Sequence, residues 1–550
     1  MRRAIACNAY EFASPAVDIV SSRLYKYFHF QVIYSPRKEE KRSEEKMCLL
    51  FGETSFFIQE LKLAEITTIP KVPSHVEGLD EVLEGGLPLG RTAMVYGAAG
   101  TGKTVLGVQF IYKTALAGTP GIIVSFEESA DALKQNANSL GWNLAELEQL
   151  NTLAILTPQI DFQAVVSGSF TLSGLLAMLQ ERSRTLGASH ILIDGIDAML
   201  RLLPDASSQR NELLRFHNWF VEQGMTAIMN TKMHAKLPET PEFPFLEYAA
   251  DVVIHLSVSR NDPQPSRRLQ VVKYRGSGFK RSSFPYTVVP RYGITVIPIS
   301  MQRVIKNSGE RRVPTGHAEL DRMSGGGLVK GHSLLIAGPS GVGKTLFVSL
   351  FAEAACTRGE KVLLLSFEEG VGQIVASTAS AGIDLQSHID SGNLRLITHL
   401  PETAGLETHL YHHVQELRSF SPDHVIVDSI TPIGRMADQR AVFEYILRLV
   451  ALCRQMGTTC ILTRQVASFS LEDTLKDIEF VSQLDMILSL IYIQESDAVD
   501  RALLVLKTRG SGHSNRFHRY TISDDGIRFL PLAGRRPEKE TFDGQPIAEE

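Results

Sequence analysis

The sequence predicts an α/β fold that is built twice in tandem. A phosphate-binding pattern, G-x-x-x-x-G-K-[ST], occurs at residues 97–104 and again at 338–345. Its two lysines, Lys103 and Lys344, lie 241 residues apart (344 − 103), and two Phe-Glu-Glu motifs show the same offset. A period of this length indicates duplication of a whole domain, because solenoid repeats are far shorter.

The first 65 residues do not resemble the rest of the chain. Residues 17–34 are apolar and aromatic, and residues 37–46 form a run of mixed charge. Two interpretations stay open for residues 1–65: an extension that binds a partner, or a poorly ordered leader whose true start is Met47.

From residue 66 onward, short β-branched runs alternate with helical ones, which is typical of a parallel sheet covered by helices on both faces. The first copy has predicted helices near 104–117, 131–140, 173–186 and 211–223, and predicted strands near 92–96, 121–126, 153–156, 190–194 and 225–231. Strands without intervening helices follow at 251–258, 269–274, 284–289 and 294–297, and in the second copy at 485–492, 502–508, 517–522 and 527–530. Each sheet should therefore end in an antiparallel extension.

These patterns also set the expected domain boundaries. We expect a first domain at 66–298, a linker at 299–313 and a second domain at 314–531. The polar tail at 532–550 is expected to be disordered.

Both phosphate-binding patterns lie between an apolar run and a helical run, which is the context that such a loop requires. Glycines let the backbone N–H groups turn inward around phosphate oxygens, and the following helix N-terminus favours the same anion. The lysine can reach the β- and γ-phosphates, and the threonine can bind Mg²⁺. The residues expected to contact nucleotide are Gly97, Ala98, Ala99, Gly100, Thr101, Gly102, Lys103, Thr104 and Val105, and Gly338, Pro339, Ser340, Gly341, Val342, Gly343, Lys344, Thr345 and Leu346.

Carboxylates end two further predicted strands in each copy. Asp194 and Asp428 each follow an apolar run, and at the carboxyl edge of a parallel sheet they would complete the Mg²⁺ site with Thr104 and Thr345. The Glu-Glu pairs follow the strand after the loop helix. We expect the first carboxylate of each pair, Glu127 and Glu368, to take a proton from the attacking water.

A Lys-x-Arg-Gly-Ser motif also occurs twice. Lys273 and Arg275 lie at the end of a late strand in the first copy, and Lys507 and Arg509 occupy the matching place in the second. A solvated edge strand would carry such residues too. Because Arg275 and Arg509 have no obvious partner in their own domain, we expect them to contact a neighbouring subunit's nucleotide.

Composition limits the other classes of function. The formal net charge of −5 gives no electrostatic case for nucleic-acid binding. Five cysteines without paired spacing (Cys7, Cys48, Cys356, Cys453 and Cys460) favour reduced thiols in a cytoplasmic protein. No apolar run approaches the length of a membrane span. His409, His412 and His413 have helical spacing, and we expect an exposed histidine-rich face rather than a metal site.

The duplicated motifs resemble those of the KaiC-type ATPases of the RecA/DnaB-like superfamily. The resemblance spans roughly residues 66–530. It implies two tandem RecA-like P-loop domains, ATP and Mg²⁺ as ligands, and a hexamer with nucleotide bound between subunits. It further implies Glu127 and Glu368 as catalytic bases, and Lys273, Arg275, Lys507 and Arg509 as residues that act on the neighbouring subunit.

Clock members of this family are also serine/threonine autokinases with adjacent Ser and Thr acceptors. At the matching place this sequence has Val481-Ser482, so Ser482 is the acceptor candidate and a two-site cycle is not expected. Protein partners of a signalling system are expected for such a switch. Two alternatives remain: a motor on single-stranded DNA, for which the loop at 232–248 is aromatic but not strongly basic, and a nucleotide-stabilised scaffold.

Overall fold

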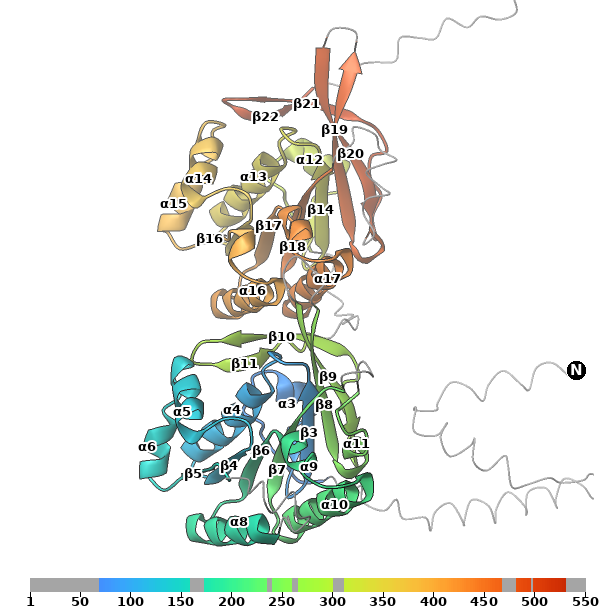
Figure 1. Cartoon of the computed structure of the whole chain (residues 1–550). Helices are drawn as coiled ribbons and strands as arrows, with labels where there is room; N and C mark the ends of the chain where they lie inside the picture. The colour runs from blue at the N-terminus through green and yellow to red at the C-terminus, as the bar shows by residue number, and fades with distance from the viewer. Residues whose placement is uncertain are drawn as a thin grey trace, which may run out of the picture. The chain divides into compact units, whose positions relative to one another are not determined.

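The computed structural model describes residues 69–158, 173–234, 240–259, 266–299, 311–466, 481–495 and 498–530. The predicted N-terminal extension, Cys7, Cys48, the predicted tail and part of the loop at 232–248 lie outside these residues. The described chain forms two α/β halves, shown in blue to green and in yellow to red in Figure 1.

Each half is built on a nine-stranded sheet with the same topology. In the first half the order is β11-β10-β9-β8-β3-β7-β6-β4-β5, and in the second it is β16-β15-β17-β18-β14-β19-β20-β21-β22. The strands of the first sheet are β3 (Thr92–Gly97), β4 (Gly121–Ser125), β5 (Leu153–Leu156), β6 (His190–Asp194), β7 (Thr226–Lys232), β8 (Val252–Ser259), β9 (Ser266–Tyr274), β10 (Ser283–Val289) and β11 (Gly293–Val296). Those of the second are β14 (Ser333–Gly338), β15 (Val362–Ser366), β16 (Leu394–Thr398), β17 (His424–Asp428), β18 (Thr459–Gln465), β19 (Met486–Glu495), β20 (Ala498–Thr508), β21 (His518–Ser523) and β22 (Gly526–Phe529).

The predicted mixed sheet is confirmed in both halves. The pairs from β5 to β8 are parallel, and β8, β9, β10 and β11 then pair antiparallel. The second half repeats this arrangement, with parallel pairs from β16 to β19 and antiparallel pairs from β19 to β22. Two short ladders stand apart: β1 (Lys71–Val72) with β2 (Leu87–Pro88), and β12 (Arg312–Val313) with β13 (Leu328–Val329).

Helices cover both faces of each sheet. On β3, Ala93 and Val95 pack into one hydrophobic cluster while Met94 and Tyr96 pack into another. Successive residues of a strand face opposite sides, so both faces of this strand are buried. The first-half helices are α3 (Leu79–Val82), α4 (Lys103–Leu116), α5 (Ala130–Ser139), α6 (Leu144–Gln149), α8 (Ser173–Leu186), α9 (Ile196–Leu200), α10 (Ala206–Glu222) and α11 (Leu246–Ala249).

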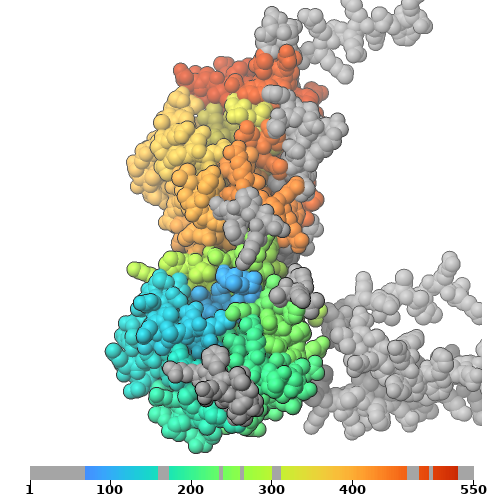
Figure 2. Space-filling model, viewed as in Figure 1, coloured from blue at the N-terminus to red at the C-terminus, as the bar shows by residue number. Residues whose placement is uncertain are grey.

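The second half has matching helices. They are α12 (Ala318–Met323), α13 (Lys344–Thr357), α14 (Val371–Ala379), α15 (Leu385–Asp390), α16 (Leu406–Phe420) and α17 (Gln439–Met456), with 3₁₀ turns η1 (Pro401–Thr403), η2 (Pro432–Arg435) and η3 (Val481–Gln483). Helices α5 and α6 (cyan) and α14 and α15 (yellow) lie at the surface of their halves (Figure 2).

One helix boundary differs from the prediction. Helix α10 begins at Ala206, five residues before the predicted start at residue 211. The Asp205 carboxylate accepts hydrogen bonds from the N–H groups of Ser207 and Ser208, at 2.8 and 2.9 Å, and so caps the helix one turn earlier.

Candidate active sites

The first phosphate loop connects the buried strand β3 to helix α4. Gly97 ends the strand, and a Cβ atom there would lie 2.2 Å from the carbonyl oxygen of Leu256, so only glycine fits. Gly102, at φ 85°, precedes the helix. The Lys103 Nζ donates hydrogen bonds to the carbonyls of Gly97 and Ala98, at 3.0 and 2.9 Å. Burial lowers the pKa of Lys103, against the pull of nearby carboxylates. The backbone of the phosphate loop thus holds the Lys103 ammonium in place.

A buried aspartate stands beside this loop. Asp194, at the end of β6, is 3% exposed, and the Thr104 hydroxyl donates to it at 3.1 Å. The Asn230 amide on β7 donates to the same carboxylate at 2.7 Å, while its own carbonyl oxygen is buried without a hydrogen-bond partner. Burial raises the pKa of Asp194, and these two hydrogen bonds oppose that shift. A hydroxyl and a carboxylate are oxygen ligands that suit Mg²⁺, so Thr104 and Asp194 fit a magnesium site. Sequence reasoning missed Asn230.

Glu127 lies at the same edge of the sheet, just after β4. Its carboxylate forms an ion pair with Lys232 of β7, at 2.6 Å. Gly195 allows this placement, because a Cβ atom there would lie 2.6 Å from the Cγ of Glu127. The neighbouring Glu128 instead turns to α5, where it accepts a hydrogen bond from Asn136 at 2.9 Å. Both acids act on Asp194, and of the two it is Glu127 that forms the ion pair with Lys232 and also acts on Lys103.

The second half repeats the site with different details. Lys344 donates to the carbonyls of Gly338 and Pro339, at 3.0 and 2.8 Å, and the Thr345 hydroxyl donates to Asp428 at 2.7 Å. Asp428 also accepts a hydrogen bond from Thr463, and burial raises its pKa. In this half, Glu368, the first glutamate of the Glu-Glu pair, has a neutral partner: the Ser429 hydroxyl donates a hydrogen bond to it at 2.7 Å.

The Lys-x-Arg pairs lie away from the phosphate loops of their own halves. Strand β9 runs antiparallel to β8 and pairs Lys273 with Val253, next to the start of β3, whereas the loop follows the end of β3. Lys273 donates to the carbonyls of Glu247 and Ala250, at 2.5 and 2.7 Å. Lys507 likewise pairs with Ile487, beside the start of β14.

The expectation that the two arginines have no partner in their own domain is wrong. Arg275 donates to the carbonyl of Tyr248 at 2.5 Å. Arg509 donates to the carbonyl of Ser482 and lies 3.7 Å from Asp485. Tyr248 lies in α11 and Ser482 in η3, and each is 27 residues from its arginine in sequence. Ser482 itself is exposed, at the centre of the turn η3.

The expected exposed histidine face is also wrong. His409 and His413 of α16 are 1% and 0% exposed, and only His412 of the three is exposed. A third ring, His399, lies 5.4 Å from His409 and 5.0 Å from His413 between centroids. Burial lowers the pKa of His409 and His413, and partial burial lowers that of His399. Among the described residues, no group of His, Cys, Asp or Glu is placed to hold a metal ion.

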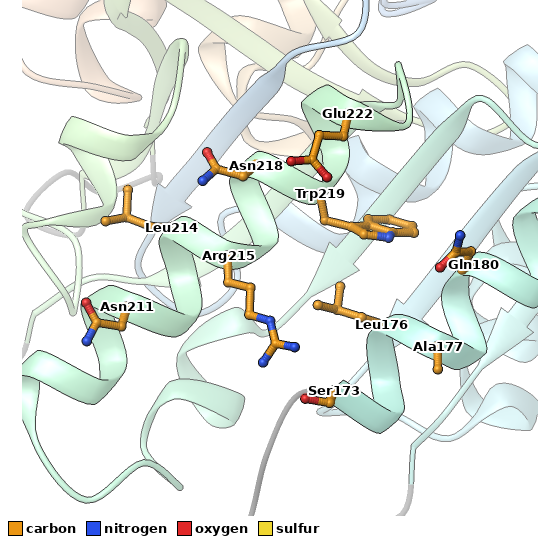
Figure 3. Close-up of a pocket in the computed structure, with 10 residues that line it drawn as sticks. All are labelled: Ser173, Leu176, Ala177, Gln180, Asn211, Leu214, Arg215, Asn218, Trp219 and Glu222. Atoms are coloured by element: carbon orange, nitrogen blue, oxygen red, sulfur yellow. The ribbon is translucent and has the colours of Figure 1, made fainter.

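A separate groove of about 580 Å³ lies between α8 and α10 of the first half (Figure 3). Arg215 and Trp219 point into it from α10, and Leu176 from α8. None of its lining residues belongs to a phosphate loop. Within the described chain, no helix is long and apolar enough to cross a membrane.

Two phosphate loops, each on a mixed sheet with its Thr–Asp pair and glutamate, define a tandem P-loop ATPase of the RecA-like class. Comparison with known proteins agrees. The family model of the KaiC ATPase matches residues 72–301 and 313–534. The circadian clock oscillator protein KaiC of Thermostichus vulcanus is 34% identical over 461 residues, covering 83% of this chain and 88% of the relative. The circadian clock protein KaiC3 of a Synechocystis strain is 30% identical over 465 residues, covering 84% and 92%. The chain belongs to the KaiC ATPase family.

Proposed function

We propose that this ATPase is a ring-forming switch that hydrolyses ATP in both halves and passes its nucleotide state to protein partners in a clock-like or signalling system. The observation that carries the proposal is that every group of the hydrolytic site occurs twice. Each half has the loop lysine, the Thr–Asp pair and a glutamate at one edge of its sheet.

The proposed hydrolysis assigns a task to each group. Lys103 and Lys344 bind the β- and γ-phosphates. The Thr–Asp pair of each half would hold Mg²⁺. Mg²⁺, when bound, neutralises charge on the phosphate oxygens. Glu127 and Glu368 orient water and accept its proton while the water oxygen bonds to the γ-phosphorus and the bond to ADP breaks.

Assembly into a hexameric ring is supported by the position of the Lys-x-Arg pairs. Each pair lies at the edge of the sheet opposite to the phosphate loop of its own half, so it would have to serve a neighbouring subunit's nucleotide. Leaving the carbonyls of Tyr248 and Ser482 costs Arg275 and Arg509 one charged hydrogen bond each, a loss of about 1.5–3 kcal/mol that contacts with the neighbouring nucleotide would have to offset. Arg509 would also leave Asp485.

Autophosphorylation is the second part of the proposal. Ser482 is exposed, and its backbone carbonyl accepts a hydrogen bond from Arg509, the residue that would reach across to the neighbouring nucleotide. Incubation with γ-labelled ATP, following free phosphate and labelled protein together, tests both activities. Release of phosphate without labelling of the protein would support ATP hydrolysis but not autophosphorylation. The absence of both free phosphate and labelled protein would refute the proposal.

A further inference from the structure

The two sites differ in what holds the general base. Glu127 is paired with the ammonium of Lys232 at 2.6 Å, whereas Glu368 accepts a hydrogen bond from the neutral Ser429 hydroxyl at 2.7 Å. A cation on the carboxylate occupies an oxygen that would otherwise take the proton of the attacking water. The first base is therefore held by a direct ion pair, whereas the second is held by a hydrogen bond from a neutral hydroxyl.

The fold does not require a lysine at this place. Lys232 pairs with Gly97 in the register of β7 and β3, and Gln465 pairs with Gly338 in the matching register of β18 and β14. Gln465 therefore occupies the position of Lys232 in the second half.

The side chain that accepts a hydrogen bond from the backbone N–H at this position also differs between the halves. The Lys232 N–H donates to the Asp197 carboxylate at 3.2 Å, and the Gln465 N–H donates to the Thr431 hydroxyl at 2.8 Å. The same backbone contact is thus made with charged partners in one half and neutral partners in the other. The charges of Asp197 and Lys232 are a property of the first site alone.

Lys232 is free to change partners. Its side chain is 43% exposed, and that of Glu127 is 32% exposed, so their ion pair is open to solvent. Exposed pairs of this kind are weak, and a lysine is a compact charge on a flexible stem. The lysine lies beside the first glycine of the phosphate loop, and its charge acts on Lys103.

We propose that Lys232 is a positioning residue that responds to the γ-phosphate: it holds Glu127 when the first site is empty or carries ADP, and moves to the γ-phosphate when ATP binds. This inference rests on the proposed role of Glu127. The carboxylate and the γ-phosphate then compete for one ammonium, so binding of the triphosphate frees the base. By thermodynamic reciprocity, Glu127 weakens triphosphate binding through Lys232.

The test measures affinity, by calorimetry, for ADP and for the slowly hydrolysed analogue ATPγS. It uses the full chain with the second loop disabled by Lys344→Ala, and repeats the comparison with both loops intact in case that variant is unstable. We expect Lys232→Gln to weaken ATPγS binding by up to about fivefold, the upper end for an exposed ion pair, and to leave ADP binding unchanged or slightly tighter. Lys232→Arg should keep the difference in affinity between ATPγS and ADP. Lys113→Gln on α4 is the matched control.

A double-variant cycle gives the decisive comparison. Glu127→Gln should tighten ATPγS binding when Lys232 is present and have no effect in the Lys232→Gln protein. Equal losses for ADP and ATPγS, or additive effects of the two substitutions, would overturn the inference and leave Lys232 as a counter-charge for Asp197. These readouts do not depend on turnover, so a failure of Glu127 as the base shows separately, as undiminished phosphate release by Glu127→Gln.

Discussion

Replacing Glu127 by glutamine separates catalysis from folding in the first site. Glutamine keeps the size of the side chain but cannot accept the proton of water. A general base contributes about 10²–10⁴-fold, so hydrolysis in the first half should fall by that factor. The loss of stability should be small, because the partly exposed pair with Lys232 contributes about 0.2–1 kcal/mol.

The assay must isolate the first site. Phosphate release is measured in the Glu368→Gln background, where the second half no longer masks the effect, and thermal unfolding is followed on the same samples. Glu128→Gln is the control, since Glu128 contacts Asn136 on α5. Phosphate release close to that of the Glu368→Gln parent would refute the assignment of Glu127 as the base.

Three further outcomes are expected. In light scattering, saturating Mg-ATP should raise the measured molar mass from that of a smaller species to that of a ring. A monomer at micromolar concentration would contradict the proposed assembly. Mass spectrometry after incubation with ATP should find slow phosphorylation at Ser482 that Ser482→Ala and Glu368→Gln abolish; phosphate elsewhere would show that the acceptor is a different residue. Burial of His190 lowers its pKa to about 4, so the unfolded chain binds the proton more tightly. The stability this residue contributes is therefore present above pH 6.5 and lost as the pH falls toward 4, a change of up to about 3 kcal/mol. Denaturant unfolding of the wild type and His190→Leu should show this loss in the wild type only, and parallel pH profiles would contradict it.

Motif spacing predicted the groups that lie close together in the chain. The phosphate loops, Asp194 and Asp428 each belong to a short pattern that reports its own local structure, and the alternation of strands and helices predicted both mixed sheets. Asn230 and Lys232 carry no such pattern. They approach the site because β7 lies between β3 and β6, a neighbour relation that no local segment encodes.

The apolar periodicity of helix α16 explains why two of its histidines are buried. The buried face of α16 includes Leu406, Leu410, Val414 and Leu417. His409 and His413 precede Leu410 and Val414 and fall within the same stripe of three- and four-residue steps. The apolar periodicity of the helix therefore predicted their burial, whereas the polar character of histidine favoured the surface.

The presence of two nucleotide-binding sites per chain is tested most directly by counting bound nucleotide. Equilibrium dialysis of the Glu127→Gln/Glu368→Gln protein with Mg-ATP should give two nucleotides per chain. Adding Lys103→Ala or Lys344→Ala should remove one each. A stoichiometry of one per chain, or a count that neither lysine changes, would contradict the account.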